Sequence, residues 1–255
     1  MWVLVLLGIV GGVFAGVFGA GGGIILVPLF VTVVGLDQRR ASATSLLAVL
    51  PSSLAGGLTY LAHGEVDLLA AAVISVGAIT GSLVGSALLK RLPLAALTWG
   101  FVALLVLVAA RLLFVEPVRG DPLAFSPGVA VVYLALGLVM GVTSGLFGIG
   151  GAVIAVPALV AGLGVSDLIA KGTSLTVIVA TSITGSLANR RGGLVDVRTA
   201  LIVGGVAAVA AVGGSYLGLA LPPRLSTVLF AALLVLTAVQ LSVRTLRARR
   251  RRPEA

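Results

Sequence analysis

The chain has 255 residues, of which 59% are hydrophobic and only 10% are charged, and its mean hydropathy is +1.24. A soluble domain of this size needs a charged surface, so the composition excludes an ordinary soluble protein. The formal net charge is +9, and the absence of cysteine excludes disulfides and thiolate metal sites.

Long apolar stretches with few or no charges predict ten helical segments, five in each half of the chain. They cover residues 2–18, 23–36, 41–62, 66–90 and 94–115, and then 128–147, 152–165, 169–189, 195–220 and 225–244. Several have the roughly 20 residues needed to cross a bilayer core of about 30 Å, so we expect an all-α polytopic membrane protein. The first segment lacks the basic start of a secretory signal and is expected to be a mature helix.

The two halves repeat one another at an offset of 129 residues. Without a gap, 14 of the 29 positions from Gly8 to Leu36 match those from Gly137 to Val165, and Asp67 still matches Asp196. Each half is too long for a solenoid repeat, so the fold is expected to contain two copies of one large unit. We divide the chain into a first membrane repeat at residues 1–121, a second at 122–243 and a basic tail at 244–255.

Five segments per half would invert the second repeat relative to the first. A cytoplasmic tail would leave thirteen Lys and Arg residues inside and four outside, which is the expected bias. Parallel repeats with four crossings each would instead move Arg39, Arg40, Lys90 and Arg91 outside. We therefore favour inverted repeats, with the arginine tail anchored to acidic lipid headgroups rather than bound to nucleic acid.

The second segment of each half is short. Residues 24–36 would reach only about 20 Å as a helix, which is less than the hydrocarbon thickness. The first two segments of each half could instead form a re-entrant helical hairpin with a glycine turn, which leaves the sidedness count unchanged. Two inverted hairpins entering from opposite faces would bring their tips together near the midplane.

The glycine turns are the first candidate substrate-binding elements. Glycines let the chain turn sharply and bring backbone N–H groups close to a ligand, while the following helix start favours an anion. The candidates are Gly19, Gly21, Gly22, Gly148, Gly150 and Gly151. The alternative is tight helix packing, which we prefer for the four-residue series at Gly8, Gly12 and Gly16, at Gly77, Gly81 and Gly85, and at Gly137, Gly141 and Gly145.

Hydroxyl side chains in the third segment of each half form a second candidate layer. Ser52 and Ser53 follow Pro51 and correspond to Thr181 and Ser182. They could donate to an oxyanion, or they could bond to their own helix backbone. Four more candidates open the same segments, where helix capping is the main alternative: Thr44, Ser45, Thr173 and Ser174.

Catalytic, cofactor and metal sites are not expected. All eight acidic residues lie at segment ends or in loops, so no buried carboxylate relay is visible, and the chain has one histidine. Lys171 could help attract an anion or be an ordinary loop lysine. An intramembrane enzyme would need a nucleophile or metal constellation that this chain lacks, so we do not expect an enzyme.

A repeated motif resembles a known family. Gly-x-Phe-Gly-x-Gly-Gly followed by a proline six residues on occurs at residues 16–28 and 145–157, and Thr-Ser-Leu occurs at 44–46 and 173–175. Over about residues 5–243 the chain resembles the sulfite exporter TauE/SafE family, also called the toluene sulfonate uptake permeases. The resemblance implies a bacterial-type inner-membrane transporter for sulfite, sulfoacetate or related sulfur-containing anions. It also implies seven or eight spans, fewer than ten segments unless the short ones re-enter.

The expected function is transport of a small anion across the cell inner membrane. An anion leaves a negative cell interior without a proton, since one charge crossing 100 mV is worth about 2.3 kcal/mol, which favours export. The alternatives are sodium- or proton-coupled uptake and a non-transport membrane scaffold. The expected partners are the small anion and membrane lipid but not nucleic acid, and a homo-oligomer is compatible with the sequence.

Overall fold

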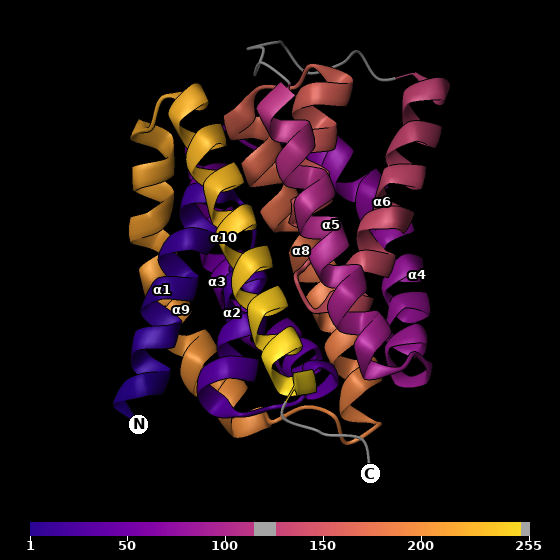
Figure 1. Ribbon diagram of the computed structural model, residues 1–255. Coiled ribbons are helices and arrows are strands. Elements are labelled where there is room, and N and C mark those ends of the chain that lie inside the picture. The colour runs from indigo at the N-terminus through magenta and orange to yellow at the C-terminus, as the bar shows by residue number, and fades with distance from the viewer. Residues whose placement is uncertain (115–125, 251–255) are drawn as a thin grey trace.

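The computed structural model describes residues 1–114 and 126–250, and within those ranges every regular element is helical (Figure 1). The elements are α1 (Trp2–Phe18), α2 (Gly23–Leu29), η1 (Phe30–Val34), α3 (Gln38–Ala62), α4 (Leu68–Arg91), α5 (Leu94–Phe114), α6 (Pro127–Phe147), α7 (Ala152–Pro157), η2 (Ala158–Gly162), α8 (Asp167–Arg190), α9 (Val197–Ala220) and α10 (Pro223–Arg250). The predicted repeat boundary after residue 121, Arg119, and residues 251–255 of the tail lie outside the described residues.

Seven of the described helices are long and apolar enough to cross a membrane: α3, α4, α5, α6, α8, α9 and α10. The prediction of an all-α polytopic membrane protein is therefore confirmed. Helix α1 has 17 residues, and the segments at 23–34 and 152–162 are shorter still. The predicted basic tail begins as helix, because α10 continues to Arg250.

Three of the acidic residues cap the starts of helices. The side chains of Asp37, Asp67 and Asp196 each accept a hydrogen bond from the backbone N–H three residues further on. Such a cap satisfies one of the N–H groups that a helix start leaves unpaired. Helices α3 and α8 begin at Gln38 and Asp167, earlier than the predicted starts at 41 and 169, and this difference matters for the site.

The short second segment of each half is not one uniform helix. An α-helical turn containing Pro28 or Pro157 is followed by a wider π-helical stretch, η1 or η2. Because proline has no N–H, one backbone bond of the narrow helix is missing at this point. The sequence predicted the positions of these segments but not their π-helical ends, which are often found near functional sites.

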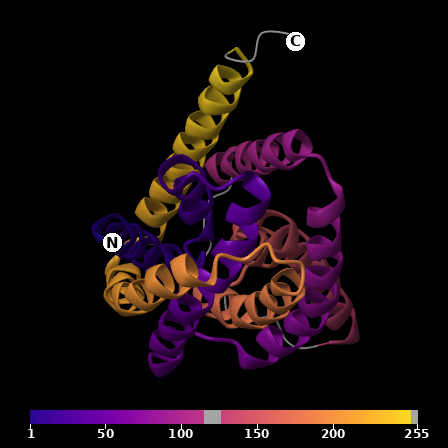
Figure 2. The same ribbon diagram turned by 90° about the horizontal axis from the view of Figure 1, so that it is seen from below.

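Helices α3 and α8 pack together at the centre of the bundle. They are the least apolar of the seven candidate spans and also the most buried, with 56% and 61% of their most apolar windows inside the protein. Helix α1 packs along α9, α6 packs along α4, and α5 packs against α10 (Figures 1 and 2). The first helix of each half therefore packs on the fourth helix of the other half.

The glycine series form the packing seams of these pairs. A side-chain carbon at Gly12 or Gly16 would collide with the backbone of α9 at Ala207 or Ala211. The seam between α4 and α6 is built the same way from both sides, by Gly77, Gly81, Gly85, Gly137, Gly141 and Gly145. The preferred packing interpretation of these glycines is confirmed, since only glycine allows the two backbones to approach so closely.

The two halves begin at opposite ends of the bundle. Helix α1 starts at the lower end of the view in Figure 1, whereas α6 starts at the upper end. At the lower end Lys90 Nζ donates a hydrogen bond to the carbonyl oxygen of Ala188 at 2.8 Å, which joins the ends of α4 and α8. At the upper end the N–H of Asp67 donates to Thr173 Oγ1 at 3.0 Å, which joins the starts of α4 and α8.

Candidate functional site

The two predicted glycine turns reverse the chain between α1 and α2 and between α6 and α7. Three glycines in each turn have positive φ angles: 65°, 67° and 77° at Gly19, Gly21 and Gly22, and 74°, 79° and 87° at Gly148, Gly150 and Gly151. Only glycine enters this left-handed region without steric strain, so the sequence dictates both reversals.

The turns lie against each other in the protein core. A side-chain carbon at Gly23, the first residue of α2, would lie 2.6 Å from the Cα of Ile149 and 2.7 Å from the carbonyl oxygen of Gly148. Ile149 is completely buried. The prediction that the two turns meet is confirmed, and helices α3 and α8 supply the side chains around them.

One hydroxyl from each central helix supports the neighbouring turn. Ser52 Oγ lies 3.4 Å from the carbonyl oxygen of Gly21 and 2.9 Å from that of Val49. Thr181 Oγ1 makes the corresponding contacts in the second half, 3.3 Å to Gly150 and 3.1 Å to the carbonyl oxygen of Ile178. The alternative interpretation of these two residues, bonding to their own helix, therefore holds, and both also contact the turns.

Four other predicted hydroxyls are buried without a hydrogen-bond partner among the described residues. They are Ser45, Ser53, Ser174 and Ser182, and each has a relative exposure of 0%. The hydroxyl of Ser53 lies close to the first turn, 3.1 Å from where a side-chain carbon of Gly21 would be. A buried hydroxyl without a partner is costly, so these four groups remain candidates for binding a ligand.

Thr44 and Thr173 have a structural contact. Their Oγ1 atoms accept hydrogen bonds from the backbone N–H groups of Asp196 and Asp67, each at 3.0 Å. The capping alternative for these threonines is wrong in its detail, because α3 and α8 start several residues earlier. Each threonine instead fixes the residue that caps a neighbouring helix, α9 or α4.

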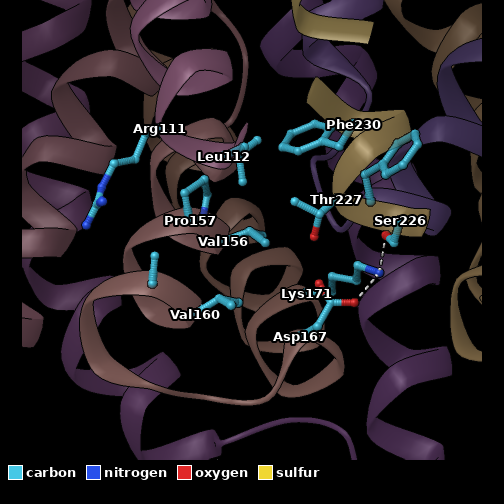
Figure 3. Close-up of a pocket in the computed structure, with 12 residues that line it drawn as sticks. Arg111, Leu112, Val156, Pro157, Val160, Asp167, Lys171, Ser226, Thr227 and Phe230 are labelled. Atoms are coloured by element: carbon cyan, nitrogen blue, oxygen red, sulfur yellow. Dashed lines mark hydrogen bonds and ion pairs between the residues drawn. The ribbon is translucent and has the colours of Figure 1, made fainter. Parts of the chain in front are cut away.

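A polar cluster lies where α8 and α10 begin (Figure 3). Lys171 Nζ forms an ion pair with Asp167 Oδ2 at 2.7 Å and donates a hydrogen bond to Ser226 Oγ at 2.7 Å. The Lys171 and Asp167 side chains have relative exposures of 2% and 8%. Lys171 is thus a buried helical residue rather than a loop lysine, and Asp167, which lies at a segment end as predicted, is buried with it.

The cluster lines a small cavity of about 20 Å³, room for about one water molecule. Phe18 and Phe230 stack beside it with ring centroids 5.2 Å apart, and Arg111 lies on the opposite side with its guanidinium pointing away from Lys171 (Figure 3). The signal that could have revealed the pair is the i, i+4 spacing of Asp167 and Lys171, which places both on one helix face.

No group of three or more His, Asp or Glu side chains in the described part of the chain could hold a metal ion. The buried charged side chains among the described residues are those of Lys171 and Asp167. The arrangement therefore offers hydroxyls and one paired lysine to a solute, and these groups can bind a small oxyanion by hydrogen bonds.

Comparisons with known proteins bear on this arrangement. The sequence profile of the family described as "Sulfite exporter TauE/SafE" matches residues 1–112 and 133–255. The chain belongs to the TauE/SafE family. It is similar to "Probable membrane transporter protein YunE" of Bacillus subtilis, with 29% identity over 76% of this chain and 80% of the relative. It is also similar to "Probable membrane transporter protein YdhB" of the same organism, with 27% identity over 72% and 77%.

A third relative, "Probable membrane transporter protein" of Xylella fastidiosa, is 29% identical over 75% of each chain. No solved structure matches the chain. The family and the names of these relatives point to a membrane transporter and not to an enzyme. The resemblance inferred from the repeated motif is confirmed.

Proposed function

We propose that this TauE/SafE transporter is a secondary carrier that moves a small sulfur-containing anion, sulfite or an organosulfonate, out of the cell. One observation carries the proposal: two left-handed glycine turns are in contact at the core, between the two central helices that carry four buried hydroxyls without partners among the described residues, and one of these, Ser53, lies close to the first turn. Gly19, Gly21, Gly22, Gly148, Gly150 and Gly151 would form the backbone of the site, with Ser45, Ser53, Ser174 and Ser182 as donors. The family name supports the substrate class.

The hydroxyls carry more of the expected affinity than the helix starts do. The α-helical parts of α2 and α7 have only 7 and 6 residues, so their dipoles are short. A hydrogen bond from a neutral hydroxyl contributes roughly 0.5–1.5 kcal/mol. Ser52 and Thr181 would hold the turns in place, and Thr44 and Thr173 would fix the surrounding helices.

We further propose that the two halves are inverted repeats whose opening helices form re-entrant hairpins. The opposite starting ends of α1 and α6 support the inversion (Figure 1). The short lengths of α1, of residues 23–34 and of residues 152–162 support re-entry. With the C-terminal arginines in the cytoplasm of a plasma-membrane protein, Arg39, Arg40, Lys90 and Arg91 would also face the cytoplasm.

The experiment is a flux measurement in liposomes that contain the purified protein and sulfite or a small sulfonate. Flux that follows an imposed voltage supports export, since a monovalent anion gains about 2.3 kcal/mol per 100 mV, roughly a fiftyfold concentration ratio. Flux that ignores voltage but follows a sodium or proton gradient would replace export with coupled uptake. That second candidate is favoured by the burial of Asp167, because ionisable side chains inside a membrane protein commonly mark an ion pathway.

A further inference from the structure

The ion pair between Lys171 and Asp167 has little value as a simple stabilising contact. Transferring two charges from water into the protein interior is costly, and replacing such a pair by neutral groups is often neutral or stabilising. Both charges are nevertheless buried here, beside a cavity large enough for about one water molecule. The geometry therefore calls for another role for this pair.

The pair breaks the repeat symmetry of the protein. At the offset of 129 residues, Asp167 and Lys171 correspond to Gln38 and Ser42, and Ser226 corresponds to Leu97. Gln38 and Ser42 are also buried, and their polar side-chain atoms have no hydrogen-bond partner among the described residues. The chemistry at the two equivalent places is thus charged in one half and neutral in the other.

The aromatic surroundings of the two places are nevertheless equivalent. Phe18 stacks on Phe230 at 5.2 Å, and the corresponding residues Phe147 and Phe101 stack at 5.6 Å. Among the described residues, the fold therefore keeps the same aromatic pair at both places but forms the ion pair at one of them. A purely architectural requirement for the ion pair would apply to both.

Each of these places also contacts a glycine turn. A side-chain carbon at Gly19 would lie 2.6 Å from the Cα and the Cβ of Lys171, and one at Gly148 would collide with the backbone of Ser42. The backbone of Lys171 is thus in direct contact with the first turn, so a movement of that turn would also displace the ion pair. This contact links the cluster to the proposed central site.

We propose that Lys171 is an anion-binding residue at one mouth of the transport path, where Asp167 competes with the passing anion for its ammonium group. The mouth lies at the end of the bundle where α8 and α10 begin, opposite the C-terminal end of α10. Ser226 holds the ammonium between the two partners. At the equivalent place in the other half, the residues that correspond to Asp167 and Lys171 are the neutral Gln38 and Ser42. This inference rests on the proposed function and adds a charged gate to it.

The test compares Lys171→Gln, Asp167→Asn and the double variant with wild type, by flux in liposomes and by thermal stabilisation with sulfite and small sulfonates. Lys171→Gln should raise KM about ten- to hundredfold, because it removes a charged donor. Asp167→Asn should lower KM, because the competing carboxylate is gone. The double variant should resemble Lys171→Gln. Lys90→Gln is the matched control, a lysine that donates to one carbonyl oxygen at the other end.

A structural ion pair would give a different pattern. Both single variants would then lower the unfolding temperature, the double variant would restore it, and KM would stay unchanged throughout. That result overturns the gate. If Lys171→Gln does not fold, Lys171→Arg replaces it, because arginine keeps the positive charge. A near-native KM in Lys171→Arg together with a lowered KM in Asp167→Asn would support the proposed gate. An unchanged KM in Asp167→Asn would overturn it.

The same measurements separate the gate from the transport function. If wild type carries the anion and Lys171→Gln has an unchanged KM, the transport function is supported and the proposed role of Lys171 is refuted. If the anion raises the unfolding temperature of wild type but not of Lys171→Gln, and wild type shows no flux, the binding role of Lys171 is supported and the transport function is refuted. If wild type shows neither anion flux nor thermal stabilisation by the anion, both the transport function and the proposed role of Lys171 are refuted.

Discussion

Replacing Gly21 by alanine tests the first glycine turn directly. Its φ of 67° would hold the new residue in the left-handed region, which costs about 1–2 kcal/mol. The added carbon would lie 2.8 Å from Val49 Cγ1 and 3.1 Å from Ser53 Oγ, and crowding of this kind costs about 1–3 kcal/mol more. The expected total is about 2–5 kcal/mol, and the crowding falls on the proposed site.

Gly35→Ala is the matched control for this change. Gly35 has a φ of 82°, so the same backbone strain applies, but a side-chain carbon there has nothing within 4 Å. We expect both variants to unfold at lower temperature in detergent and both to elute as folded protein. In liposomes Gly35→Ala should carry sulfite at the wild-type rate, whereas Gly21→Ala should lose most of the flux.

Two results would refute the reasoning about the turn. Equal flux in Gly21→Ala and wild type, at equal amounts of reconstituted protein, would show that the turn does not bind or pass the anion. Loss of flux in Gly35→Ala as well would show that general destabilisation, and not the turn, controls transport.

Three further changes give separate expectations. Ser53→Ala and Ser182→Ala remove hydroxyls that have no partner among the described residues, so the unfolding temperature should change little while the anion KM rises about two- to tenfold; an unchanged KM would exclude these hydroxyls from the site. Gly81→Leu should prevent α4 and α6 from packing, seen as loss of the monodisperse peak in size-exclusion chromatography, and a normal peak would contradict the seam. For Asp196, burial tends to raise the pKa, but hydrogen bonds from the Thr199 N–H and hydroxyl, with a nearby arginine, hold the pKa below its usual range. A lowered pKa means that this carboxylate stabilises the fold above its unfolded pKa of about 3.9 and stops doing so as pH falls through the lower folded value. Asp196→Asn should therefore be less stable than wild type at pH 7, and the difference should shrink as pH falls below about 3.9; a constant difference would contradict this.

The glycine positions show what the sequence could predict. Four-residue spacing on one helix face predicts a packing seam, and the series at Gly77, Gly81 and Gly85 forms one. Clustered glycines at an element boundary predict a reversal, and Gly21 and Gly150 have the left-handed backbone that this requires. In both cases the signal is local, because glycine is needed for a geometric reason that no other residue satisfies.

The ion pair shows what the sequence could not predict. Lys171 lies at the edge of a charge-free stretch, where hydropathy alone allows either a loop or the first turns of a helix. Helix α8 begins at Asp167, two residues before the predicted start, so the carboxylate and the lysine share one face. Ser226 at the start of α10 and Phe18 line the same cavity as the pair, and such long-range neighbours leave no periodic signal in the sequence.

Thr44 illustrates the same limit for hydroxyls. From the sequence, Thr44 and Ser45 are equivalent candidates because they are neighbours at the start of one segment. In the structure Thr44 accepts the backbone N–H of Asp196, more than one hundred residues away, whereas Ser45 has no partner among the described residues. The difference arises from which way each side chain faces in the bundle, and it separates a residue that fixes a helix from one that remains a candidate for ligand binding.

The proposed competition between Asp167 and the anion resolves a conflict between binding and release. At a separation of 4 Å and an effective dielectric constant of 20, an unpaired lysine would attract an anion by about 4 kcal/mol, which slows release roughly a thousandfold. In this proposal the Asp167 carboxylate, 2.7 Å from the same ammonium, re-forms its ion pair when the anion leaves, and this offsets most of the attraction between Lys171 and the anion. Lys171 can then draw the anion toward the mouth without trapping it there. Asp167→Asn should therefore lower the maximal flux as well as KM, and a lowered KM with undiminished maximal flux would show that release is limited elsewhere.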